Sequence, residues 1–329
     1  MAIGEGRKSY IQFGQEAAWG TGVAATDRLE VISIDVGPEQ GIILDPSLNN
    51  SVGRRGVFQG GTLYRGTFVV RMNYSGLEKL FSCLLGVAGT STIDGAGPAY
   101  DHLLHDGMAQ ETVKSLTIEL IEGDIEPGLC QRLLGCTFTS CTIRGTAGQG
   151  QDAMLTAEFE VLAKDKVVGF TPTGALVAPA VNPILFHHGT TMDNGVVASN
   201  LLMRTIEVRY EAPHASDLFF FGSRNPAEFI RDDFVKATYR FTEALQTTDV
   251  LEALQQFTNA TPRMLFTAGT LAPSGTYEFE IKSEKGTVSR ASHPVSGYGT
   301  IYLESTVEAY HDPTLGTCWM NFRNEKTAI

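Results

Sequence analysis

The residues best suited to metal binding are the adjacent pair His187 and His188. Adjacent side chains on a strand point to opposite faces, so both imidazoles can bind one ion only across a turn. The chain also has five cysteines: Cys83, Cys130, Cys136, Cys141 and Cys318. They do not have zinc-ribbon spacing, and no Cys/His cluster stands near the histidines. We therefore expect no metal site and interpret Cys130, Cys136 and Cys141 as small apolar residues of a sheet.

Two further patterns match catalytic or phosphate-binding motifs only in part. Gly145, Gly148 and Gly150 outline a phosphate loop, but no Lys-Ser/Thr follows, and residues 155–161 alternate like a strand. Phosphate loops open a helix at that point, so a hairpin turn is the better interpretation. Glu158 and Glu160 could form the carboxylate pair of a glycosidase. Acidic residues that alternate along a strand are usually solvated, however, so we expect no enzyme and no cofactor.

Composition bounds the class of protein. The chain has 329 residues, 43% of them apolar, and a formal charge of −12. A core can therefore form, but a chain this acidic is poorly suited to wrapping DNA by neutralising phosphates. An odd number of cysteines argues for a reducing compartment. The N-terminus lacks the apolar stretch of a signal peptide, and no apolar run is long enough to span a membrane, so we expect cytoplasm-like conditions.

Strands and two short helices account for most of the pattern. Apolar and polar residues alternate over 116–120, 155–161, 206–211 and 277–282, which predicts half-buried antiparallel strands. Helical spacing appears over 77–85, with Ser75 and Glu78 as a capping box and Gly86 as the stop. A second helical stripe runs over 250–257 after Asp249.

The two helices indicate an internal repeat. Tyr64-Arg65-Gly-Thr67 precedes the first helix, and Tyr239-Arg240-Phe-Thr242 precedes the second. Both the strand motifs and the helix starts are offset by about 175 residues, which suggests a duplicated unit. We expect a first domain over 1–170, an extended junction over 171–199 that packs along one domain or a neighbouring chain, and a second domain over 200–329.

The order of elements resembles that of tail tube (major tail) proteins of long-tailed bacteriophages, in a duplicated form. The opening Tyr10-Ile-Gln-Phe-Gly-Gln-Glu16-Ala-Ala-Trp-Gly20 and the closing Trp319-Met-Asn-Phe-Arg-Asn324 are similar to segments of that family. The resemblance implies a mainly β fold: two tandem antiparallel β-sandwich or barrel domains, each with one short helix and a long hairpin loop. It also implies that sheets from several subunits join around a lumen.

The resemblance further implies a structural virion protein with other tail proteins as partners. Three copies of a duplicated chain would form a pseudo-sixfold ring, and stacked rings would form the tube through which the genome is delivered. The expected partners are other copies of this chain, tail terminator and tail tip proteins, the tape measure protein in the lumen during assembly, and genomic DNA that passes without specific binding. Assembly would take place in the host cytoplasm.

Strand parity and loop position give candidate residues for that role. The lumen candidates Glu158, Glu160, Glu304 and Glu308 lie on the polar parity of their strands, where negative charge would repel DNA. Arg65 and Arg71 also lie on the polar parity of their strand, which argues against a uniformly acidic lumen. A long loop in the first hairpin and its counterpart near 219–229 would contact the adjacent ring. The candidates there are Asn49, Arg54, Arg55, Phe58, Phe220 and Arg224.

Two other functions remain open from the sequence. One is a different virion β-protein, such as a decoration or baseplate component with a carbohydrate-binding face. The other is a hydrolase with scattered catalytic carboxylates.

Overall fold

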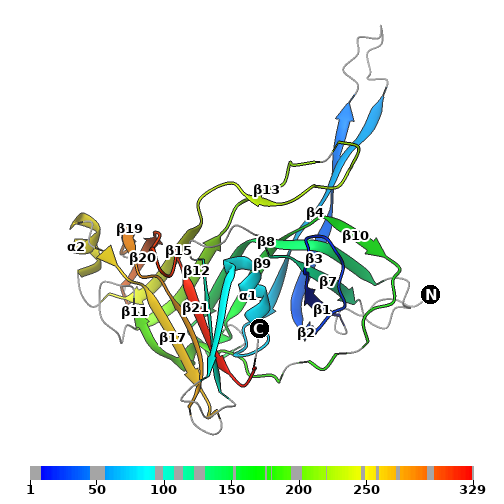
Figure 1. Ribbon diagram of the computed structural model, residues 1–329. Coiled ribbons are helices and arrows are strands. Elements are labelled where there is room, and N and C mark those ends of the chain that lie inside the picture. Colours follow the sequence, from blue (N-terminus) through cyan, green and yellow to red (C-terminus); the bar gives the residue numbers. More distant parts are fainter. Residues whose placement is uncertain are drawn as a thin grey trace.

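The computed structural model describes most of the chain. The described residues are 9–44, 56–92, 99–106, 114–121, 130–150, 153–174, 176–178, 180–193, 202–219, 221–245, 249–256, 259–271, 275–294 and 300–327. These residues form an antiparallel β protein with two short helices (Figure 1). The mainly β class that the alternating pattern predicts is therefore confirmed.

The larger sheet is built around one continuous run of antiparallel strands. In spatial order the run is β3 (Val31–Leu44), β4 (Val57–Arg71), β9 (Thr156–Ala163), β8 (Gln131–Thr146), β12 (Met203–Glu211), β15 (Lys236–Ala244), β20 (Tyr302–Ala309) and β19 (Gly286–Ser292). Shorter strands complete this sheet. β7 (Leu116–Ile121) and β10 (Asp165–Val168) pair with β8, β1 (Tyr10–Gln15) and β2 (Asp27–Leu29) continue from β7, and β16 (Asn259–Ala260) pairs with β19.

One pairing in this run connects the two halves of the sequence. Residues 140–146 of β8 pair with residues 205–211 of β12 in antiparallel register. The run from β3 to β8 belongs to the first half of the chain, and the run from β12 to β19 belongs to the second. We call the β8–β12 pairing the joint.

A second sheet covers one face of the first. Its order is β11 (Gly189–Asp193), β17 (Arg263–Ala268), β18 (Tyr277–Lys282), β21 (Trp319–Asn324), β6 (Tyr100–His105) and β5 (Val87–Thr92). The helix α1 (Glu78–Leu85) lies between the sheets, because the Phe81 ring packs 5.1 Å from Phe159 and 5.6 Å from Phe322. β21 pairs with β6, so both halves of the chain contribute to one core.

The helices are where the sequence predicts them, but the cap of α1 differs. α1 ends at Gly86, whose φ of 107° suits glycine. Its N-cap residue is Leu77, and no side chain caps it. The capping box of Ser75 and Glu78 is therefore wrong: Glu78 is buried, accepts a hydrogen bond from the Gly76 N–H at 2.9 Å, and lies 3.4 Å from Lys326 Nζ. The second helix, α2 (Asp249–Gln256), packs against β19.

The junction packs along the first half of the chain through its earlier residues, and its strand β11 pairs with β17 of the second half. The Thr173 N–H and hydroxyl both bond the Glu119 carboxylate, at 2.9 and 3.0 Å. Further on, the Tyr74 N–H bonds the Asn182 carbonyl at 3.1 Å. This cover makes β7 buried on both faces, Glu119 included, whereas alternation predicted a half-buried strand.

A β-bulge changes the parity of β8. The register shifts between Phe138 and Ser140, so one extra residue separates the two halves of the strand. Cys136 and Cys141 are both buried in the core as a result, although their odd spacing predicts opposite faces. None of the five cysteines, all of which the structure describes, forms a disulfide, and all five are buried. Gly145 lies near the end of β8, and Gly148 and Gly150 lie between β8 and β9, as a hairpin turn requires.

The opening motif is organised by one buried carboxylate. Glu16 Oε2 accepts hydrogen bonds from the Gly20 N–H at 2.7 Å and the Ser115 hydroxyl at 2.6 Å. Its Oε1 accepts from the Thr117 hydroxyl at 2.8 Å and the Gly135 N–H at 2.9 Å. All these donors face one charge, so Glu16 connects β1, β7 and β8.

Candidate assembly surfaces and the open sheet face

The large sheet has one polar face that the second sheet does not cover. On β9, Phe159 points to α1, so Glu158 and Glu160 point the opposite way. Residues directly opposite each other on paired strands share a face. The open face, as we call it, therefore carries these charged side chains: Asp35, Glu39, Arg65, Arg71, Arg144, Glu158, Glu160, Glu207, Arg209, Glu211, Lys236, Arg240, Arg290, Glu304 and Glu308.

A chain of ion pairs crosses the joint on the open face. Arg144 Nη1 lies 2.8 Å from Glu158 Oε2, and its Nε lies 3.0 Å from Glu207 Oε2. The other oxygen of Glu207 accepts a hydrogen bond of 2.9 Å from Arg240. The hydrogen bond to Glu207 is the largest cause of the raised pKa of Arg144. One carboxylate therefore holds two guanidinium groups from different halves of the chain.

The four lumen candidates lie on this face but in different surroundings. Glu158 bonds Arg144, and Glu160 accepts a 3.2 Å hydrogen bond from Ser140 and lies 3.9 Å from Arg65. Glu304 and Glu308 are exposed, and within the described chain neither forms an ion pair. The open face thus alternates in charge along its centre and is acidic toward β20.

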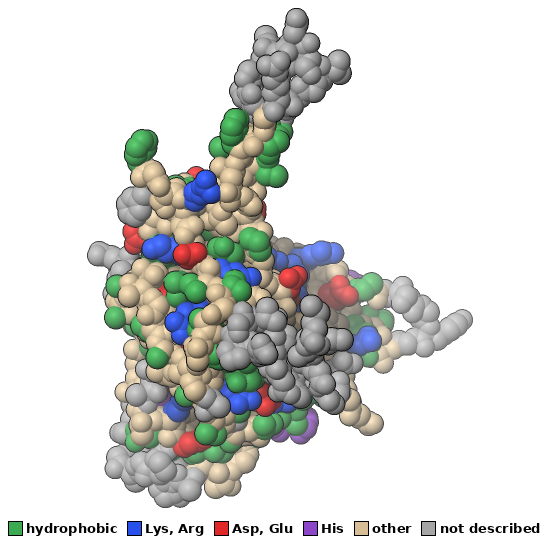
Figure 2. Space-filling view, turned by 90° about the vertical axis from the view of Figure 1, so that its right-hand side faces the viewer, with side chains coloured by type: hydrophobic (Ala, Val, Ile, Leu, Met, Phe, Trp, Pro, Cys, Tyr) green, Lys and Arg blue, Asp and Glu red, His purple; other side chains and the backbone are tan. Residues whose placement is uncertain are grey.

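A long hairpin projects from the body. The arm consists of the outer residues 37–44 of β3 and 57–63 of β4 (Figure 1). Apolar side chains lie exposed along it, which Figure 2 shows below the undescribed tip. They are Ile42, Ile43, Leu44, Val57 and Phe58. Exposed apolar groups on a projecting element are typical of a surface that a partner covers.

A segment of the second half lies against the base of the arm. The strap, residues 213–235, includes β13 (His214–Ala215) and β14 (Ile230–Arg231) and rises beside the arm in Figure 1. Its Arg224 donates a 2.6 Å hydrogen bond to the Gln59 side chain, and the Arg224 carbonyl accepts one from the Thr62 N–H at 2.8 Å. Phe229 is buried against Trp19, with ring centroids 5.3 Å apart.

The loop candidates are brought together only in part. Phe58 is exposed on the arm, and Arg224 bonds the neighbouring residue Gln59. The segments predicted as loop and counterpart thus lie side by side in one chain. Asn49, Arg54, Arg55 and Phe220 lie outside the described residues.

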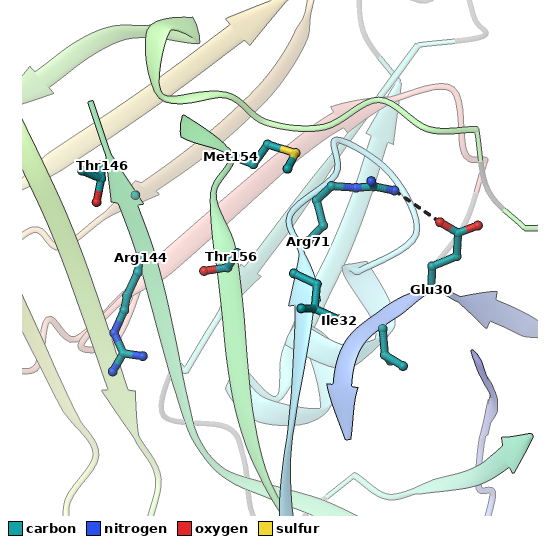
Figure 3. Close-up of a pocket in the computed structure, with 9 residues that line it drawn as sticks. Glu30, Ile32, Arg71, Arg144, Thr146, Met154 and Thr156 are labelled. Carbon is teal, nitrogen blue, oxygen red and sulfur yellow. Dashed lines mark hydrogen bonds and ion pairs between the residues drawn. The ribbon is translucent and has the colours of Figure 1, made fainter. Parts of the chain in front are cut away.

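A shallow pocket of about 500 Å³ opens where β3 begins beside the ends of β4, β8 and β9. Figure 3 shows Arg71 pointing to Glu30, 3.3 Å away, and Arg144 pointing away from that pair. Ile32 and Met154 supply apolar lining, and Thr146 and Thr156 supply hydroxyls. The described lining contains no nucleophile beside a base, so the pocket has no hydrolytic constellation.

The histidine pair is structural in the described part of the chain. His187 and His188 belong to a 3₁₀ turn (Phe186–His188), and His188 Nδ1 lies 3.2 Å from the Tyr74 hydroxyl. Among the described residues, no group of three His, Cys, Asp or Glu side chains could hold a metal ion. Likewise, none of the described helices is long and apolar enough to cross a membrane.

Sequence reasoning missed the residues that connect the halves. Glu207 and Arg209 alternate with buried Ile206 and Val208, so their parity could have placed them on the open face. The partner of Glu207 across the joint, Arg144, could not be found in this way, because it lies more than sixty positions earlier in the sequence. The strap gave no periodic signal that would place Phe229 against Trp19.

An antiparallel sheet with one free polar face, a projecting apolar arm and unpaired margins defines a β protein built to associate with other chains. The sequence model of the family described as phage tail tube protein matches residues 6–309. The chain belongs to this family, and it is a structural protein of the phage tail tube. A search of curated proteins found no match.

Proposed function

We propose that this chain polymerises into stacked rings that form the hollow tail tube through which the phage genome is delivered. Each ring would contain three copies, and each copy would supply two tube units, residues 1–170 and 200–329, with the junction 171–199 between them. The observation that carries the proposal is the joint, where the sheets of the two halves pair edge to edge.

Equivalent contacts in the two halves support a duplicated unit. Thr67 of the first Tyr-Arg-x-Thr motif pairs with Glu160, and Thr242 of the second pairs with Glu304. In each half the motif strand is followed by a short helix and lies second in its half of the run. The joint is then an internal copy of the contact between neighbouring chains.

The margins of the run supply the edges for that contact. Among the described residues, β3 pairs only with β4, and β19 pairs only with β20 beyond Thr287. An unpaired edge invites another strand, and closure into a ring removes both edges. The β19 edge of one copy would meet the β3 edge of the next, and the open face would line the lumen because the second sheet covers the other face.

The arm and strap suit contact with the adjacent ring. Apolar residues lie exposed on both, among them Phe58 and Phe221. We extend this surface to the candidates Asn49, Arg54, Arg55 and Phe220. At its ends the tube would meet tail terminator and tail tip proteins, and the tape measure protein would occupy the lumen while the tail assembles in the host cytoplasm.

Electron microscopy of the purified protein, with light scattering over time, tests the proposal. Rings with threefold symmetry and pseudo-sixfold shape, or hollow tubes, support it. A protein that stays monomeric even when tail tip proteins are supplied as initiators contradicts it.

Arm variants separate ring closure from stacking. Ile42→Asp/Ile43→Asp places charges on the exposed arm and should give rings without tubes. Val177→Asp/Val181→Asp is the matched control, because both valines are also exposed but lie on the junction. If the control blocks tubes equally, the arm is not the stacking surface.

A further inference from the structure

Five arginines on the open face lie beside carboxylates, whereas Arg204 lies over the Tyr302 ring. Arg209 lies 2.6 Å from Glu211, Arg71 lies 3.3 Å from Glu30, and Arg65 lies 3.9 Å from Glu160. Arg144 and Arg240 share Glu207 across the joint. Arg290, on β19, has no carboxylate partner among the described residues. In the proposed ring, the β3 edge of the next copy would bring Asp35 and Glu39 beside β19.

The pairing matters because guanidinium is the group that binds phosphate best. Its planar fork matches two phosphate oxygens, and every such contact displaces counterions from DNA. The overall charge of −12 does not by itself prevent such contacts. Repulsion from distant carboxylates is screened beyond about 8 Å at physiological salt, so an unpaired arginine in a lumen would still bind a passing phosphate.

We propose that Glu158 and Glu207 mask Arg144 and Arg240, so that the lumen wall does not bind the phosphate backbone of passing DNA. This inference rests on the proposed function, which makes the open face the lumen wall. Glu207 is the central residue, since each of its oxygens accepts a hydrogen bond from a different arginine. Passage of DNA without binding then depends on the ion pairs around each arginine and not on the net charge of the chain.

The alternative is that these ion pairs serve only folding. The side chains of Arg144 and Arg240 are 54% and 61% exposed, and exposed ion pairs contribute little to stability. Loss of the carboxylates should therefore leave the fold intact while it frees both guanidinium groups.

Four glutamates on one face allow a matched test. Glu158→Gln/Glu207→Gln removes two paired carboxylates, and Glu304→Gln/Glu308→Gln removes two that form no ion pair in the described chain. Both double variants change the net charge by the same amount. The measurement is binding of a fluorescent DNA duplex to the purified chain across a salt series, with thermal unfolding as a check of folding.

We expect Glu158→Gln/Glu207→Gln to bind duplex DNA at low salt, with a slope of log K against log salt that is steeper than wild type by about two, one phosphate contact per freed arginine. Glu304→Gln/Glu308→Gln should bind as weakly as wild type. Adding Arg144→Gln/Arg240→Gln to the first variant should abolish the gained binding.

Equal binding by the two double variants would overturn the proposal in favour of net charge. Unchanged binding by Glu158→Gln/Glu207→Gln would overturn it as well, and so would wild-type binding as tight as that of this variant. Tube formation is scored separately by microscopy, so a failure of the proposed ring is distinguished from a failure of masking.

Discussion

Arg231 donates a 2.8 Å hydrogen bond from Nη2 to the carbonyl oxygen of Leu84, the penultimate residue of α1. A cation at this position also meets the negative end of the helix dipole. Arg231 lies in the strap, directly opposite His214 on the paired strand β13. This contact attaches a segment of the second half of the chain to the only described helix of the first half.

Acid should loosen the strap at this point. Burial, together with the adjacent Arg231 guanidinium, lowers the pKa of His214 to about 4, while Asp232 opposes the shift. The folded chain therefore binds this proton less tightly than the unfolded chain does. The stability that His214 contributes is present above pH 6.5 and is lost as the pH falls toward 4, by at most about 3 kcal/mol. Hydrogen exchange of residues 213–235 at pH 7 and pH 5 measures the effect.

His214→Asn is the control for this pH effect, since asparagine does not titrate in the range. After correction for the pH dependence of intrinsic amide exchange, its strap should have the same protection factor at both pH values. Equal protection of the wild-type strap at pH 7 and pH 5 would contradict the prediction.

Phe229→Ala should release the strap from the arm. The Phe229 ring is buried in a small cluster with Leu63, Leu162 and Trp19, and truncation of a buried phenylalanine costs about 3–5 kcal/mol. Phe221→Ala removes a fully exposed ring of the same segment and should leave the stability of the monomer unchanged. Chemical denaturation compares the two variants, and similar unfolding midpoints would show that the cluster does not hold the strap.

Glu16→Gln should weaken the connection between β1, β7 and β8. The amide nitrogen of glutamine cannot accept the two hydrogen bonds that one carboxylate oxygen accepts, so two buried donors lose their partner. We expect a loss of about 2–4 kcal/mol in the free energy of unfolding. Glu308→Gln, at an exposed position, should stay within about 0.5 kcal/mol of wild type in the same urea titration. A Glu16→Gln protein as stable as this control would refute the role of the carboxylate.

Gly66→Ala should force β3 away from β4. A methyl group at Gly66 would overlap the backbone of Asp35, because Asp35 lies in β3, the strand that pairs with this part of β4. We expect a loss of about 1–3 kcal/mol and faster hydrogen exchange in β3. Gly37→Ala is the control on the same hairpin, because a methyl group there would meet no atom within 4 Å. The prediction is wrong if both variants melt at the wild-type temperature.

Local patterns predicted the strands and helices but not how they pair. Alternation found β9 and β20, and it placed Glu158 and Glu304 away from the core, because side-chain direction on a strand depends only on parity. The bulge in β8 could not be predicted, since nothing in residues 136–141 marks an extra residue in the register. The burial of Glu119 was also missed, because its cover comes from Thr173, more than fifty residues later.

The two Tyr-Arg-x-Thr motifs also show which features a local pattern predicts and which depend on strand pairing. Arg240 could be placed on a polar parity from the sequence, and Arg65 likewise. Their ion-pair partners could not be predicted, because these depend on which strands are neighbours. Glu207 lies on β12 beside Arg240 on β15, and Glu160 lies on β9 beside Arg65 on β4. Gly66 and Phe241 occupy equivalent places in the two motifs, and only the structure reveals that β3 passes too close to Gly66 for a side chain.

The joint between β8 and β12 has a kinetic consequence for assembly. Two strands on one polypeptide meet at an effective concentration in the millimolar range, far above that of free subunits. Half of the edge-to-edge strand pairings in the proposed closed ring would thus form while the individual chains fold, before the chains meet in solution. In the proposed ring of three copies, nucleation would depend on the third power of chain concentration, whereas six separate units would give the sixth power. The joint would therefore lower the protein concentration at which tubes begin to grow.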